Sequence, residues 1–230
     1  QFQRFETSYH LLAEKEQDPD ILGIAKELIF IPDYLAHLLG AKKYSEYTIA
    51  SVSNLYNLVR NEWDREILDA YGLPQKIFMP IVYAGEKVGE IAKDVTDELQ
   101  TPSAEIYAVG SHDTAFAVVA APAADDEEFL FISSGTWSLV GAELRHPIMT
   151  EESMRLGFGN EGGVMRRNRF ICNVMGLWIL QECVRMWKLQ GKAYDFAGLA
   201  EEASKIVGCD MVFIDPDDER LFEPANMPEV

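Results

Sequence analysis

Apolar residues recur along the chain with two different spacings. In the first part of the sequence they fall three or four positions apart, which is the period of an amphipathic helix, and Gly and Pro interrupt them. We expect helices at 7–17, 20–31, 32–39 and 63–71, with Asp20 and Asn61 as N-caps of the second and the fourth. A short strand near 88–91 and a helical turn at 94–99 should follow.

Further along, short apolar runs bounded by turn residues predict strands that alternate with helices. We expect strands at 106–109, 129–132, 137–144, 166–172 and 211–214, and helices at 114–121, 173–189 and 194–206. The strands on either side of SSGT at 133–136 should form a β-hairpin. This alternation predicts an α/β fold with a domain boundary near 122–128.

Composition and charge narrow the classes of protein. The 230 residues are 48% hydrophobic and 25% charged, as in a folded globular chain, and the net charge is −18. A strongly acidic chain is unsuited to non-specific binding of nucleic acid or an anionic membrane, so neither is expected as a partner. No apolar run approaches the ~20 residues needed to span a bilayer.

The cysteines and the chain ends bear on location and completeness. Cys172, Cys183 and Cys209 are odd in number and lack metal-ligand spacing, which favours reduced, buried thiols in a cytoplasmic protein. The four histidines show no ligand spacing either, so no metal-ligating residues are assigned. The chain begins without Met and without a leader-like segment, and it stops after Val230. We expect both ends to be cuts in a longer polypeptide.

The loop GSHDT at 110–114 lies between an expected strand and an expected helix. Ligands of open α/β sheets bind where such loops converge, and an aspartate there can accept the proton of a substrate hydroxyl. Asp113 is therefore a candidate catalytic base. The alternative is that Asp113 only caps the following helix and that His112 is structural.

The segment SSGT at 133–136 is a second candidate. Its glycine turn and hydroxyls suit phosphate oxygens, although an ordinary hairpin turn explains the same residues. Asn173 at the expected helix start and Gln181 eight residues later differ by about 80° in heading, so both can flank one cleft. By themselves they would be a cap and a surface residue.

The glycine pattern GFGNEG at 157–162 matches the dinucleotide-binding fingerprint by spacing. That fingerprint requires a buried strand before it and a helix after it, and neither is expected here. We interpret the segment as a turn in a β-rich region.

Taken together, the segments resemble the FGGY carbohydrate kinases, and within that family most closely the rhamnulokinase group. The resembling segments are IPDY at 31–34, LLG at 38–40, EWD at 62–64, SHDTA at 111–115, SSGTWS at 133–138, NEGG at 160–163, NVMGLW at 173–178 and DPDDER at 215–220. They follow the order of the family and extend over nearly the whole chain.

The resemblance implies an actin/hexokinase-like fold of the ribonuclease H type, with 1–122 as the later part of the N-terminal domain and 128–230 as the beginning of the C-terminal domain. It implies ATP-dependent phosphorylation of a ketose, L-rhamnulose to L-rhamnulose 1-phosphate, with Mg²⁺. Asp113 matches the catalytic base. His112, Asp113, Thr114 and Asn173 match sugar-contacting positions, and Gly135, Thr136 and Gln181 match ATP-contacting positions.

The sequence departs from the family at both ends. Members begin with an Asp-x-Gly phosphate loop and continue into a Gly-rich adenine site, and neither segment is present here. We therefore expect these 230 residues alone to be inactive. A kinase for another sugar, such as fuculose or xylulose, and a sugar-binding homologue without phosphoryl transfer remain alternatives, and the oligomeric state stays open.

Overall fold

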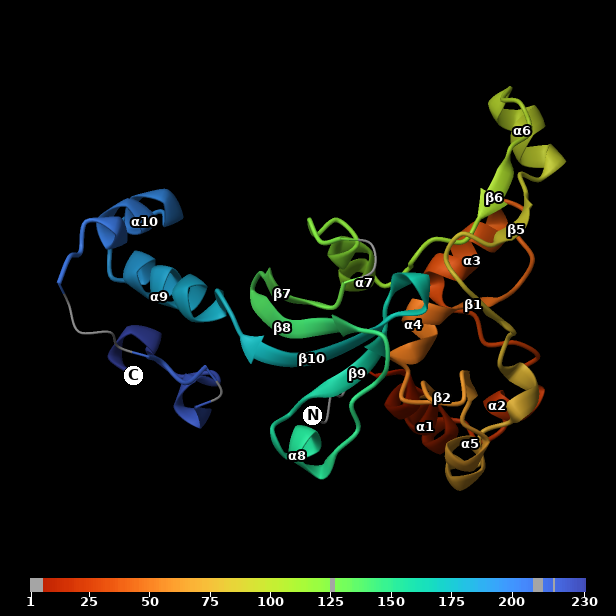
Figure 1. Cartoon of the computed structure of the whole chain (residues 1–230), viewed down its shortest axis with the longest axis horizontal. Coiled ribbons are helices and arrows are strands. Elements are labelled where there is room, and N and C mark those ends of the chain that lie inside the picture. The colour runs from red at the N-terminus through yellow and green to blue at the C-terminus, as the bar shows by residue number, and fades with distance from the viewer. Residues whose placement is uncertain (1–5, 125–126, 209–212, 217) are drawn as a thin grey trace. The chain divides into compact units, whose positions relative to one another are not determined.

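The computed structural model describes residues 6–124, 127–208, 213–216 and 218–230 (Figure 1). The chain divides into two compact units: unit 1 comprises 1–131 and 141–171, and unit 2 comprises 132–140 and 172–230. Cys209, Met211 and Val212 lie outside the described residues, as does Asp217 of the 215–220 segment. Phe213 and Ile214, the rest of the expected strand 211–214, are in neither a helix nor a strand.

The described elements alternate between helices and strands, as expected. The helices are α1 (Thr7–Gln17), α2 (Ile21–Ile24), α3 (Ile31–Leu38), α4 (Tyr47–Ser51), α5 (Arg65–Tyr71), α6 (Lys93–Leu99), α7 (Asp113–Val118), α8 (Glu151–Arg155), α9 (Trp178–Leu189) and α10 (Phe196–Ser204). The strands are β1 (Ser45–Glu46), β2 (Tyr56–Asn57), β3 (Glu62–Trp63), β4 (Ile81–Val82), β5 (Lys87–Glu90), β6 (Glu105–Tyr107), β7 (Phe129–Ser134), β8 (Trp137–Leu144), β9 (Gly159–Gly162) and β10 (Asn168–Met175).

The largest described sheet has the strand order β7-β8-β10-β9. Strands β7 and β8 are hydrogen-bonded neighbours joined by the turn at 135–136, which confirms the expected hairpin. Strands β9 and β10 are antiparallel, and their register sets Arg169 opposite Glu161. The glycine pattern at 157–162 ends in strand β9 and opens no helix, which fits its interpretation as part of a β-rich region.

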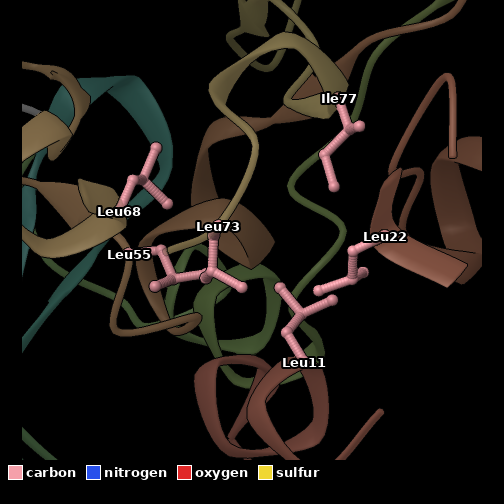
Figure 2. Close-up of a cluster of buried hydrophobic side chains, with 6 residues drawn as sticks. All are labelled: Leu11, Leu22, Leu55, Leu68, Leu73 and Ile77. Atoms are coloured by element: carbon pink, nitrogen blue, oxygen red, sulfur yellow. The ribbon is translucent and has the colours of Figure 1, made fainter. Parts of the chain in front are cut away.

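One apolar core of unit 1 lies among its helices. Six side chains with 8% exposure or less make one cluster (Figure 2): Leu11, Leu22, Leu55, Leu68, Leu73 and Ile77. They come from α1, α2, α5 and the connections around them, so residues far apart in sequence share one apolar interior. Full burial of each such side chain is worth about 1.5–3 kcal/mol, and this cluster anchors the helical part of unit 1.

Two of the expected helices differ in the structure. The helix expected at 20–31 is α2 alone, because the chain becomes extended at Ala25 and Leu28 pairs with Phe78 as a β-bridge. The helix expected at 63–71 begins at Arg65, with Asp64 rather than Asn61 as its N-cap. The Asp64 carboxylate accepts hydrogen bonds from the backbone N–H groups of Glu66 and Ile67.

In unit 2, α9 packs through Trp178 and Ile179 against a small cluster of Met175, Leu221 and Met227. Cys172 is buried, and Cys183 is half-buried. Within the described ranges, no helix combines the length and the apolar composition that crossing a bilayer requires.

Candidate functional site

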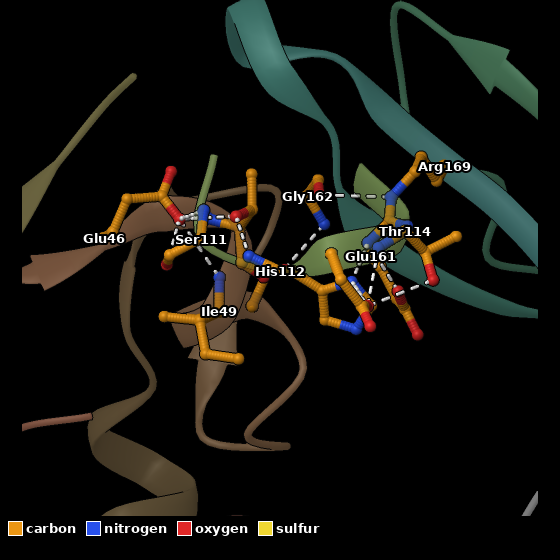
Figure 3. Close-up of polar contacts among 11 residues, drawn as sticks. Glu46, Ile49, Ser111, His112, Thr114, Glu161, Gly162 and Arg169 are labelled. Carbon is orange, nitrogen blue, oxygen red and sulfur yellow. Dashed lines mark hydrogen bonds and ion pairs between the residues drawn. The ribbon is translucent and has the colours of Figure 1, made fainter. Parts of the chain in front are cut away.

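The loop before α7 is fixed by a buried carboxylate from another part of unit 1. Glu46 is 1% exposed, and its Oε2 accepts five hydrogen bonds, from Thr48 N, Thr48 Oγ1, Ile49 N, Ser111 N and Ser111 Oγ. Thr48 Oγ1 in turn accepts a hydrogen bond from His112 N at 3.0 Å. Figure 3 shows Glu46 and Ser111 meeting at this point. Because the donors come from both segments, Glu46 joins the start of α4 to the loop at 110–112.

Glu46 is itself held by a second buried acid. Its backbone N–H donates to Asp33 Oδ2 at 3.0 Å, and Asp33 on α3 is 1% exposed. The pKa of Asp33 is raised to about 7, mainly by burial; the hydrogen bond from Glu46 N opposes this shift, and the nearby Glu46 charge adds to it. The loop at 110–112 is thus anchored through two layers of buried polar groups.

Asp113 stands at the exposed end of this rigid loop. Its side chain is 98% exposed, and its Oδ1 accepts hydrogen bonds from Thr114 N at 2.6 Å and Thr114 Oγ1 at 3.3 Å. The N-cap position of α7 belongs to His112, and Asp113 is the first residue inside the helix. His112, and not Asp113, is therefore the N-cap residue, although the Asp113 carboxylate still accepts a backbone N–H of the first helical turn. The carboxylate is exposed at the end of an anchored loop, where a substrate hydroxyl can reach it.

His112 lies beside Asp113 and contacts a buried arginine. Its Nδ1 is 3.6 Å from Asp113 Oδ1 and 3.4 Å from Arg169 Nη2. Burial lowers the pKa of His112 to about 4, the Arg169 charge acts in the same direction, and Asp113 opposes both. The imidazole is therefore neutral at physiological pH.

Arg169 completes this group from β10. It is fully buried, and its Nη2 donates to Glu161 Oε2 at 2.7 Å while its Nε donates to Gly162 O at 3.3 Å. Burial raises the pKa of the Glu161 carboxyl and lowers that of Arg169, and each partner's charge opposes the shift of the other. These contacts bring the 160–163 segment to the same place as the 111–115 segment.

Unit 2 brings together the residues predicted to bind ATP. Gln181 on α9 donates from Nε2 to Thr136 Oγ1 at 3.2 Å. The carbonyl of Gly135 accepts from Leu177 N at 2.9 Å, and the Thr136 carbonyl accepts from Gly176 N at 3.2 Å and from Trp178 N at 3.1 Å. The turn between β7 and β8 is therefore bonded directly to the beginning of α9, with the Thr136 hydroxyl beside the Gln181 amide.

Asn173 differs from its expected position. It lies near the end of strand β10, and α9 begins only at Trp178, with Leu177 as the N-cap residue. The expectation that Asn173 starts the helix, and with it the 80° relation to Gln181, is wrong, because residues 168–175 pair as a strand with β9 and β8. Asn173 is half-buried in unit 2.

Sequence reasoning missed the residues that support the candidate site. Glu46, Arg169 and Glu161 were not singled out, although Glu161 belongs to the quoted NEGG segment at 160–163. The ion pair between Glu161 on β9 and Arg169 on β10 forms across two strands, and no local sequence pattern predicts such a pair. Among the residues that the structure describes, no three His, Cys, Asp or Glu side chains gather as metal ligands.

The fold and these two groups of residues define a class of protein. Residues 2–120 match the N-terminal domain of the FGGY family of carbohydrate kinases, and residues 130–230 match the C-terminal domain of the same family. The chain belongs to the FGGY family of carbohydrate kinases.

Among its relatives are bacterial rhamnulokinases. The chain is 38% identical to that of Oceanobacillus iheyensis over 230 residues, which is all of this chain and 47% of the relative. It is 39% identical to that of Halalkalibacterium halodurans over 227 residues, 99% of this chain and 47% of the relative. The chain therefore spans about half the length of the curated relatives it matches.

Solved structures of sugar kinases have the same fold. The ligand-bound xylulose kinase of Lactobacillus acidophilus matches with a TM-score of 0.68 at 19% identity, over 86% of this chain and 40% of that one. The xylulose kinase of Rhodospirillum rubrum matches with a TM-score of 0.68 at 12% identity, over 88% of this chain and 39% of that one. The expected actin/hexokinase-like α/β fold, present in part, is confirmed.

Proposed function

We propose that this chain is part of an ATP-dependent ketose kinase that converts L-rhamnulose to L-rhamnulose 1-phosphate. The family and the rhamnulokinase relatives support a sugar kinase. The observation that carries the reaction is the exposed Asp113 carboxylate on a loop anchored by the buried Glu46. Phosphoryl transfer depends mainly on positioning, so a fixed base beside an open surface fits it.

In the proposed reaction, the Asp113 carboxylate accepts the proton of the sugar 1-hydroxyl. The hydroxyl oxygen forms a bond to the γ-phosphorus of ATP, and the bond from that phosphorus to the β–γ bridging oxygen breaks, which releases ADP. His112, Thr114 and Asn173 are proposed to contact the sugar. The Thr114 hydroxyl already lies within 3.3 Å of the Asp113 carboxylate, so both can meet one polyol.

The residues of unit 2 fit the nucleotide through neutral donors. The Thr136 hydroxyl and the Gln181 amide lie 3.2 Å apart at the hairpin, and Gly135 N donates to Trp137 O at 3.0 Å across the turn. Mg²⁺ usually binds phosphate oxygens and few protein groups, so its proposed role is to neutralise the phosphates to which it is bound.

We also propose 1–122 and 128–230 as the parts of the two family domains, which the matches at 2–120 and 130–230 support. The cytoplasmic location and the absence of nucleic acid and membrane partners stay predictions.

The test is Asp113→Asn in the complete protein. Loss of a general base lowers kcat by at least ~100-fold, so an ADP-release assay with L-rhamnulose should show that loss. The control is Asp97→Asn, which changes an exposed aspartate on α6 and should leave kcat unchanged. Near-normal turnover of the Asp113→Asn protein would contradict the proposed base. If the wild-type protein shows no preference for L-rhamnulose over other ketoses in the same assay, the proposed sugar is wrong.

A further inference from the structure

The fully buried guanidinium of Arg169 needs a reason beyond stability. Taking a charge out of water is unfavourable, and ion pairs often fail to compensate for the lost hydration. Arg169 faces Glu161 across the β9–β10 pair, and that ion pair occupies only part of its donor set. Another of its contacts leads out of the sheet, toward the loop that carries Asp113.

That contact bears on which ring nitrogen of His112 carries the proton. Arg169 Nη2 is 3.4 Å from His112 Nδ1, and a guanidinium has donors only. For the pair to be a hydrogen bond, Nδ1 must therefore hold a lone pair, and the proton of the neutral ring must be on Nε2. In Figure 3, Arg169 and Glu161 lie together next to His112.

The same geometry limits what His112 can do to Asp113. The separation of 3.6 Å between His112 Nδ1 and Asp113 Oδ1 would suit an ion pair only if Nδ1 carried a proton. With the Nδ1 lone pair directed at Arg169, the imidazole does not compete for the Asp113 carboxylate. That carboxylate then remains free to take a proton from a bound hydroxyl.

The charges around His112 favour the neutral ring. The groups that act on it are Arg169 from β10 and Asp113 from its own helix, and Arg169 is further paired with Glu161 from β9. From α4, Oε2 of the Glu46 carboxylate accepts hydrogen bonds from Ser111 N and Ser111 Oγ, and Glu46 therefore contacts the loop through Ser111. The nearest charge to Nδ1 is therefore the cation, which opposes protonation.

We propose that Arg169 is a positioning residue that holds His112 as the neutral Nε2–H tautomer. In this form the ring offers an Nε2–H donor for a sugar oxygen, and Asp113 stays the proton acceptor. The effect on turnover rests on the proposed function, whereas the tautomer is a property of this chain and can be measured without any substrate.

The direct test is ¹⁵N NMR of the histidine-labelled chain between pH 5 and 8, with His112→Gln used to assign the His112 signals. The wild-type chain should show an unprotonated Nδ1 and a protonated Nε2 throughout this range. In Arg169→Met the two tautomers should mix, and the pKa of His112 should rise by about one unit, because a nearby cation has been removed. The matched control is Arg155→Met, an exposed arginine on α8, which should change neither.

Several results would overturn the proposal. It is wrong if wild-type His112 carries its proton on Nδ1 or is charged at pH 6, and also if Arg169→Met leaves the tautomer and the pKa unchanged. Should Arg169→Met fail to fold, Arg169→Gln takes its place. Glutamine carries no charge, so the pKa of His112 should still rise, and an unchanged value counts against the proposal.

Kinetics of the complete protein separate this proposal from the proposed function. Arg169→Met should lower kcat/KM by about 10–100-fold, and Arg169→Lys should restore part of it. If Asp113→Asn proves fully active while the tautomer depends on Arg169, the kinase mechanism fails and the positioning role of Arg169 stands. If the tautomer does not depend on Arg169, the positioning role fails whatever the activity of the Asp113 variant.

Discussion

Glu143 on β8 is a buried acid that should make stability depend on pH. It is 7% exposed, and its Oε2 has no hydrogen-bond partner among the described residues. Burial raises its pKa to about 7, although the charges of Arg169 and Arg167 oppose the shift. The folded chain therefore binds more protons than the unfolded one between the ordinary glutamate pKa and about 7. The stabilisation is present at low pH and is lost as the pH rises through 7.

The expected outcome is that Glu143→Gln removes this part of the pH dependence. The wild type should lose roughly 1–3 kcal/mol more free energy of unfolding than the variant when the pH is raised from 5 to 8, because one pKa unit corresponds to about 1.36 kcal/mol. Urea unfolding at both pH values measures the difference. Glu152→Gln, on the exposed surface of α8, is the control and should follow the wild type. Parallel pH profiles for the wild type and Glu143→Gln would show that Glu143 is not the cause.

At the scale of residues, the sequence identifies the exposed members of the candidate site better than the buried ones. Asp113 is recognisable because it follows a predicted strand and opens a helix. Glu46 reaches Ser111 over 65 positions and Arg169 reaches His112 over 57, and no local pattern specifies such contacts. The side chains that hold the site are thus set by tertiary packing.

Two aspartates at helix starts differ in a way that can be tested. Asp64 accepts hydrogen bonds from the N–H groups of Glu66 and Ile67 at the start of α5, and from Asn57. Asp20 precedes α2 and makes no capping bond. Because an N-cap contributes about 0.5–2 kcal/mol, Asp64→Ala should lower the free energy of unfolding by about that amount.

Asp20→Ala is the matched control in the same denaturant experiment. It should stay within about 0.5 kcal/mol of the wild type, the usual range for a surface substitution. Equal losses for the two variants would mean that the carboxylate–backbone bonds of Asp64 are not what stabilises α5.

At the scale of elements, periodic helices are predicted well and junctions poorly. The expectation for 7–17 coincides with α1, and the helix in 173–189 exists but begins five residues late, at Trp178. The strand expected at 166–172 is β10, which continues to Met175 because it pairs with neighbouring strands, so residues 173–175 belong to the strand and not to the expected helix. Whether such residues form a helix or a strand depends on the strands with which they pair, and a single sequence does not reveal those partners.

At the scale of the whole molecule, a net charge of −18 repels an anionic nucleotide. The groups placed at the β7–β8 hairpin, the Thr136 hydroxyl and the Gln181 amide, are neutral. Salt should therefore screen a repulsion rather than an attraction. In the complete protein, the Kd for MgATP should stay constant or fall between about 20 and 200 mM NaCl, as measured by calorimetry. Binding of the uncharged sugar serves as the control, and a clear rise in the Kd for MgATP would indicate that lysine or arginine side chains hold the phosphates.

The bonds between the hairpin turn and the start of α9 have a mechanical consequence. Gly176 leaves no room for adjustment there, since a Cβ atom at this position would lie 2.4 Å from Ser138 Oγ and 2.6 Å from Gly135 O. The turn and the start of α9 are therefore tightly packed and should move together as one rigid element. Any force that tilts α9 from its far end at Leu189 is transmitted to the Thr136 hydroxyl, so that a distant displacement becomes a movement at the proposed phosphate site.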